Sequence, residues 1–106
     1  MPPSVNYSRL SEQLKAVADP TRLRILRLLE TTDTCESVCN VSELARTLGI
    51  PQPTVSHHLK ILYNAKIVRC RKMCRDVYYW IDLAAADGVI ATLTALYRDS
   101  ETRTTP

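Results

Sequence analysis

The amino acids at positions 41–62 read VSELARTLGIPQPTVSHHLKIL, and no other stretch constrains the fold as strongly. Its first half has apolar residues at helical spacing behind Asn40, a good helix cap, and Gly49 is placed to end that helix. A turn with two prolines follows, and a second helix is predicted from Pro53 to about Asn64. Two short helices joined by a tight turn predict a helix-turn-helix.

The second of these helices has an apolar face and a polar face. At about 100° per residue, Val55, Leu59 and Leu62 fall together. His58 lies at their flank, where we expect a structural, hydrogen-bonded residue. The opposite face is polar and basic, which suits a groove lined with phosphates and base edges. The side chains of this segment expected to contact DNA are Gln52, Thr54, Ser56, His57 and Lys60.

The charged residues are unevenly distributed along the chain. Between Leu44 and Arg75 there are seven Lys and Arg residues and no Asp or Glu, whereas the rest of the chain holds seven basic and eleven acidic residues. A solvated basic face usually carries some acids as well. A block of one sign inside a folded domain therefore favours a surface that binds a polyanion.

Apolar residues at helical spacing predict three further helices. The first runs from about Tyr7 to Val17, the second begins at Pro20 behind an Asp19 cap, and the last follows an Asp82 cap. The apolar stripe of the second helix comprises Leu23, Leu26 and Leu29, widened by Ile25 and Leu28. The stripe of the last helix comprises Leu83, Ala86, Ile90, Leu93 and Tyr97.

Two short runs rich in β-branched and aromatic residues, 67–71 and 75–81, precede the last helix and are close enough to form a hairpin. This hairpin would be a basic wing beside the helix-turn-helix. Its side chains expected to contact DNA are Arg69, Arg71, Lys72 and Arg75. The chain is thus predicted to be mainly α with a β-hairpin. The expected bounds are one domain over 1–106, an ordered core over about 7–98, a helix-turn-helix over about 41–64 and a wing over about 66–81.

Length and composition exclude several classes of protein. A chain of 106 residues allows one domain, and two glycines leave little room for a Gly-rich phosphate cradle. No apolar run approaches the ~20 residues of a membrane span, and the first ten residues lack the apolar core of a secretory signal, so we expect a cytoplasmic protein. No His or acid is placed to activate a thiol, so we do not expect an enzyme.

Three segments together resemble the ArsR/SmtB family of metal-sensing bacterial repressors: ADPTRLRIL at 18–26, CNVSELARTLGIPQPTVSHHLKIL at 39–62 and VYYWI at 77–81. The resemblance covers about residues 8–97. It implies a winged helix-turn-helix of order α-α-α-α-β-β-α. It also implies a homodimer through the first and last helices, whose binding to operator DNA is weakened by an inducer.

The chain departs from the family pattern at three places. Pro51 stands where the family often has Ser, so the usual side-chain cap of the recognition helix is expected to be missing. Met73 and Cys74 stand where the wing commonly has an acidic-Gly turn. The last helix contains no His, so the family's His/carboxylate zinc site is not carried over.

The segment before the third helix holds the first pair of candidate inducer ligands, Cys35 and Cys39. Family members with a thiolate site here carry Cys-x-Cys; Cys39 matches its second position and Ser37 occupies the first. A helix N-terminus favours the thiolate form of Cys39, and thiolates bind soft ions such as As(III), Cd(II), Pb(II) or Zn(II). In the alternative interpretation Cys39 is a small buried apolar residue and Cys35 an incidental loop residue.

The predicted wing holds a second pair, Cys70 and Cys74. The spacing leaves open whether they complete one site with Cys35 and Cys39, form a second metal site, act as a redox pair, or simply pack. We take all four as candidate metal ligands, with no resident cofactor required. A redox alternative keeps the same fold but switches through a disulfide or persulfide. A DNA-binding module without any inducer is a third possibility.

Overall fold

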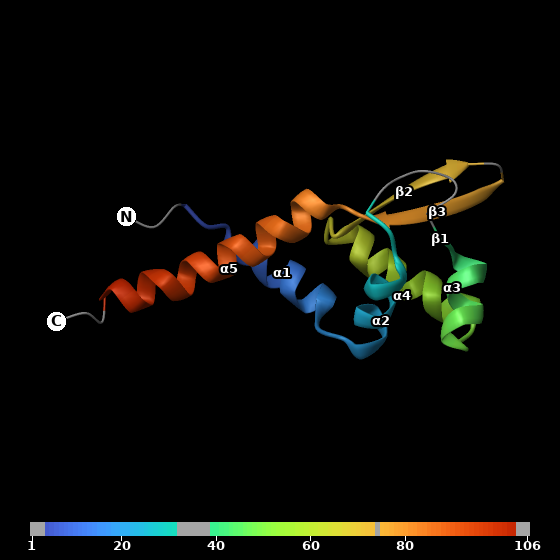
Figure 1. Ribbon diagram of the computed structural model, residues 1–106, viewed down its shortest axis with the longest axis horizontal. Coiled ribbons are helices and arrows are strands. Elements are labelled where there is room, and N and C mark those ends of the chain that lie inside the picture. Colours follow the sequence, from blue (N-terminus) through green and yellow to red (C-terminus); the bar gives the residue numbers. More distant parts are fainter. Residues whose placement is uncertain (1–3, 32–38, 74, 104–106) are drawn as a thin grey trace.

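The computed structural model describes residues 4–31, 39–73 and 75–103, so Cys35, Ser37 and Cys74 lie outside the described residues. In this part of the chain there are five helices and a small sheet, in the predicted order of a winged helix-turn-helix, and the sheet extends from one end of the molecule (Figure 1). The elements are α1 (Tyr7–Val17), α2 (Pro20–Leu28), β1 (Cys39–Asn40), α3 (Val41–Leu48), α4 (Gln52–Asn64), β2 (Val68–Met73), β3 (Asp76–Ile81) and α5 (Leu83–Arg103).

The predicted caps define the helix boundaries. Gly49 ends α3 in the left-handed conformation, with φ 69°. Pro51 is the N-cap of α4 and makes no side-chain cap bond, because its ring carries no hydrogen-bond acceptor. Four helices begin with a side-chain oxygen that accepts a backbone N–H of the first turn. At α1 the oxygen is Asn6 Oδ1, which accepts from Arg9 N at 3.0 Å, and this cap was not predicted. The other three caps are the predicted ones. These bonds run from Arg22 N to Asp19 Oδ2 (3.1 Å), from Glu43 N to Asn40 Oδ1 (2.8 Å) and from Ala85 N to Asp82 Oδ1 (3.1 Å).

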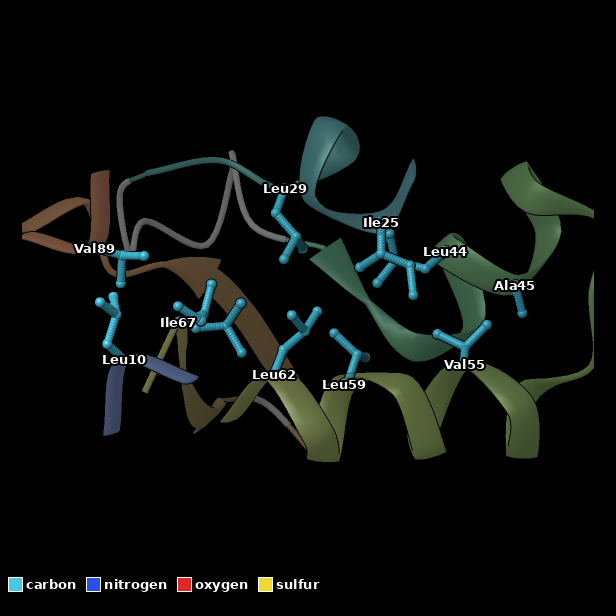
Figure 2. Close-up of a cluster of buried hydrophobic side chains, with 11 residues drawn as sticks. Leu10, Ile25, Leu29, Leu44, Ala45, Val55, Leu59, Leu62, Ile67 and Val89 are labelled. Carbon is cyan, nitrogen blue, oxygen red and sulfur yellow. The ribbon is translucent and has the colours of Figure 1, made fainter. Parts of the chain in front are cut away.

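The apolar face of α4 forms the centre of the core. Val55, Leu59 and Leu62 are each 0% exposed, and Figure 2 shows them pointing from α4 toward Ile25 and Leu44. Burying an aliphatic side chain of this size contributes about 1.5–3 kcal/mol to folding. Because the core fixes one face of α4, it also fixes which side chains the opposite face presents to solvent.

The predicted apolar stripe of α2 is wrong in one respect. Ile25 is fully buried and Leu29 is buried beyond the helix end, but Leu23 is 54% exposed. The single buried position within the helix is therefore Ile25 rather than the row through Leu23. Because α2 is short and packs against α3 and α4, these helices cover only part of its wide apolar face, and Leu23 lies on the uncovered part.

The sheet has one strand more than the sequence indicated. β2 pairs antiparallel with β3 from Val68↔Ile81 to Met73↔Asp76, so β2 extends two residues past the predicted run. β1 pairs with the other edge of β3, with Cys39 opposite Tyr79. Asn40 is thus both the end of this strand and the cap of α3.

The helix α5 is long and leaves part of its apolar surface uncovered. It runs to Arg103, beyond the expected end of the ordered core near residue 98. Val89 packs into the core, whereas Ile90 and Tyr97 are 64% and 70% exposed. Figure 1 shows α5 lying alongside α1, with both chain ends at the end of the molecule away from the wing. None of the helices in the described ranges combines the length and apolar character of a membrane span.

An apolar hollow of about 250 Å³ lies between α1, α2, the base of the wing and α5. Its lining contains almost no polar surface, and it continues the uncovered face of α5. The residues that line it are Leu14, Val17, Leu26, Ile67, Ile81, Ala86, Val89, Ile90 and Leu93.

Candidate nucleic-acid interface

The outward face of α4 places the predicted contact residues together. Because Val55, Leu59 and Leu62 hold the helix to the core, the intervening positions face solvent, and the helix carries no Asp or Glu. A polar, basic helix face without acids suits the phosphate-lined major groove. The predicted contact residues Gln52, Thr54, Ser56, His57 and Lys60 are all exposed, as are Pro53, Tyr63 and Asn64 of the same helix.

His58 is the structural residue that the helical wheel predicted. Its side chain is 15% exposed, and its Nδ1 accepts a hydrogen bond from Arg22 Nε at 3.2 Å. The Asp19 carboxylate lies 4.0 Å from the same nitrogen, too far for a hydrogen bond. His58 thus faces the helix packing, whereas the exposed ring of its neighbour His57 lies edge-on to it, with 5.7 Å between the centroids.

Arg22 also binds the end of α1. Its Nη1 donates to the carbonyl oxygens of Lys15 at 3.3 Å and Ala16 at 3.2 Å. The backbone N–H of Arg22 donates to the Asp19 carboxylate. This bond, together with the positive charge of Arg22, holds the pKa of the Asp19 carboxyl below its ordinary value of 3.8, and desolvation opposes the shift. The sequence predicted that Asp19 caps α2 but gave no sign that Arg22 joins three helices.

The wing arginines are held against a tryptophan that the sequence did not single out. Arg69 lies opposite Trp80 in the β2–β3 register, and Arg71 lies two residues further along the same face. Their guanidinium carbons are 6.0 and 5.8 Å from the Trp80 ring centroid, within cation–π range. Trp80 therefore holds two predicted contact residues on one face of the wing. VYYWI is apolar or aromatic throughout, so no alternation in the sequence marks Trp80 as the residue beneath the arginines.

The remaining two basic wing residues lie elsewhere. Lys72 is exposed but alternates with Arg71, so it lies on the other face of β2 and does not join the arginine pair. Arg75 is exposed at the tip of the hairpin and has φ 83°, a backbone conformation that favours glycine. A charged side chain at the tip is thus retained despite backbone strain.

Two of the four cysteines, Cys39 and Cys70, lie within the described residues, and both belong to the sheet. Cys70 is half-buried in β2, and Cys39 enters β1 through its backbone. Both lie opposite Tyr79, one on each side. Burial, with a smaller contribution from Cys70, raises the pKa of the Tyr79 hydroxyl. Within the described ranges no three His, Cys, Asp or Glu side chains form a metal-binding group.

The register restricts how Cys39 and Cys70 can act together. Because β3 lies between their strands, their Cα atoms are two strand spacings apart, about 9.6 Å. A disulfide requires Cα atoms within about 7 Å. These two cysteines cannot form one without movement of the sheet, so an intrachain redox pair would have to involve Cys35 or Cys74.

Comparisons with known proteins agree with this geometry. A family model described as bacterial regulatory protein, arsR family, matches residues 19–69. The chain is 34% identical over 92 residues to the arsenical resistance operon repressor of Staphylococcus aureus, which covers 87% of this chain and 84% of that protein. An ArsR-like transcriptional regulator from Rhodococcus sp. RHA1 has a TM-score of 0.80 at 25% identity, covering 92% of this chain and 87% of that one. A homodimeric winged helix-turn-helix DNA-binding domain from Mycobacterium bovis shares the fold, with a TM-score of 0.67 at 21% identity, covering 100% of this chain and 99% of that one.

Proposed function

Because the chain belongs to the arsR family of bacterial regulatory proteins, which are DNA-binding transcriptional regulators and not enzymes, we propose that it is a homodimeric repressor released from its operator by a thiophilic metal or metalloid. The observation that carries the DNA-binding part is the exposed, acid-free face of α4 beside the arginine face of the wing. The metal-sensing part depends on the cysteines.

In this proposal, basic side chains of α4 and the wing bind phosphates, and polar side chains of α4 contact base edges. Lys60 and the wing residues Arg69, Arg71 and Arg75 carry the charge that binds phosphates and makes affinity depend on salt. The residues for base edges lie on α4, whose N-terminal part normally enters the major groove. They are Gln52, Thr54, Ser56 and His57.

The uncovered apolar surface supports a dimer through α1 and α5. Ile90 and Tyr97 are exposed on α5, and Leu93 lies at the edge of the apolar hollow that α5 shares with α1. A second copy of the chain would remove this apolar surface from water. The added burial would stabilise a small domain, which buries little apolar surface by itself. The Mycobacterium bovis domain of the same fold is homodimeric. Two copies of α4 would then read two half-sites.

The position of Cys39 supports a role for the first cysteine pair in sensing. Cys39 directly precedes Asn40, the cap of α3, and its strand is paired with β3 of the wing. A ligand bound by Cys35 and Cys39 would therefore pull on α3, which leads into α4, and on the wing at the same time. A related protein carries the name arsenical resistance operon repressor. Two thiolates are too few for a trigonal As(III) or Pb(II) site, so Cys70, Cys74 or an outside thiol would supply the third ligand.

The test is release of the reduced protein from its operator. The operator is the duplex selected from a random-sequence library by the wild-type protein. Binding is then measured under strict reduction while As(III), Cd(II), Pb(II), Zn(II) or Cu(I) is added. We expect one or more ions to release the wild type, whereas Cys35→Ser/Cys39→Ser binds normally but is not released.

The matched control and the other outcomes separate the alternatives. If Cys70→Ser/Cys74→Ser fails to respond while the first double variant responds, the sensor lies in the wing. Release by an oxidant and by none of the ions would establish the redox switch instead. A protein that no ion or oxidant releases is a DNA-binding module without an inducer, and a protein that selects no sequence refutes the repressor assignment itself.

A further inference from the structure

We propose that Arg22 and His58 form a latch that sets the orientation of the recognition helix α4 relative to α1, and that this latch determines how well the protein distinguishes its operator from other DNA. The inference rests on the proposed function, because it assigns a positioning role behind the proposed DNA-reading face. Neither residue is exposed on that face.

The latch consists of the Arg22 guanidinium group, which donates hydrogen bonds to two different helices. Nε points to Nδ1 of His58 in α4, and Nη1 points to the carbonyl oxygens of Lys15 and Ala16 at the end of α1. A guanidinium plane keeps these donors in a fixed fork, so the position of the α1 end and the position of the His58 ring are coupled geometrically. Asp19 fixes the start of α2, and hence Arg22, through the Arg22 backbone N–H.

The latch also fixes which edge of the His58 ring faces α2. An arginine N–H can only donate, so Nδ1 of His58 is the acceptor in this bond. The His58 backbone is adjacent to His57, whose side chain belongs to the proposed base-reading face. A rotation of α4 that broke the bond to Arg22 would therefore also turn His57 and Ser56 away from their positions.

A second bond joins α1 directly to the end of α4. The buried Gln13 of α1 donates from Nε2 to the carbonyl oxygen of Ala65, the C-cap of α4, at 3.3 Å. Arg22 of α2 holds the middle of α4 through His58, and Gln13 of α1 holds its end, so α4 cannot tilt without breaking one of these polar contacts. Because α1 belongs to the proposed dimer interface, these contacts join dimer geometry to the angle at which α4 is presented.

The test compares selected-operator affinity with affinity for unrelated duplex DNA. Arg22→Ala should lower operator affinity about tenfold, the equivalent of one lost hydrogen bond to a charged group. Affinity for unrelated DNA and its salt dependence should change no more than in Arg24→Ala, a matched control that removes the same charge from an exposed position of α2. Circular dichroism and urea unfolding establish that each variant is folded under the binding conditions.

Variants of His58 separate positioning from a merely structural role. His58→Asn retains an acceptor close to the position of Nδ1 and should preserve most of the discrimination, whereas His58→Leu should lose it. The double variant Arg22→Ala/His58→Leu should be no worse than Arg22→Ala alone, because that variant already lacks the bond to His58. Additive losses in the double variant, equal losses on operator and unrelated DNA, or wild-type discrimination in His58→Leu would each overturn the latch. A wild-type protein that discriminates no sequence would overturn the repressor assignment, and the latch with it.

Discussion

Replacing Arg75 by glycine should stabilise the protein and weaken its binding to DNA. At φ 83° an L-residue carries a strain of about 1–2 kcal/mol, which glycine does not. Glycine has more freedom in the unfolded chain, which offsets about 0.5–1 kcal/mol of this gain. The free energy of unfolding, measured in urea at fixed protein concentration, should therefore rise by about 0.5–1 kcal/mol. The same change removes one cation from the wing tip of each protomer, so the slope of log affinity against log salt should fall by about 0.9 per protomer.

Lys66→Gly is the matched control for this experiment. Lys66 also has a left-handed backbone, with φ 67°, and an exposed cationic side chain, but it lies at the base of the wing rather than at its tip. It should gain similar stability with little change in the salt slope. If Arg75→Gly destabilises the protein, the argument from backbone strain is wrong. If its affinity and salt slope equal those of Lys66→Gly, Arg75 does not contact DNA.

Further predictions concern the other parts of the molecule. Lys60→Ala and Arg71→Ala should each reduce the salt slope of DNA binding by about one charge, and an unchanged slope in both would refute this placement of the DNA. Leu93→Glu should produce monomers in analytical ultracentrifugation and abolish operator binding, whereas Thr94→Glu at an exposed site of the same helix should leave the dimer intact. Asn40→Ala should lower the free energy of unfolding by about 1 kcal/mol through loss of the α3 cap. The folded state lowers the pKa of the Asp19 carboxyl, so the ionised carboxylate stabilises the fold fully above pH 3.8. This contribution is lost as the pH falls through the lower pKa of the folded state. Asp19→Asn should therefore flatten the plot of unfolding free energy against pH in this range.

The features that could be predicted from the sequence are those set by local chemistry. The caps at Asp19, Asn40 and Asp82 act within one turn of their own helices, and the faces of α4 follow from helical geometry. The exposed set on α4 and the hydrogen-bonded role of His58 were predicted for that reason. Their contacts with DNA stay predictions, because no nucleic acid is part of the structure.

The features that could not be predicted depend on residues far apart in the chain. The two-residue strand β1 exists only because it pairs with Tyr78 and Tyr79 of β3, and two residues carry no strand pattern of their own. Arg22 and His58 are 36 positions apart, so no spacing rule relates them. Leu23 was misplaced because helical periodicity identifies an apolar face but not how much of it the neighbouring helices cover.

The cap at Asn40 has an evolutionary consequence. Its side-chain bond to Glu43 and its pairing with Tyr78 are both made at or after residue 40, so they fix the start of α3 independently of the residues that come before Cys39. Substitutions before Cys39 would therefore replace one proposed metal-ligand atom by another without moving the start of α3. Under the proposal that Cys35 binds the inducer, selection could alter this member of the ligand set without first having to repair the helix start that leads into α4.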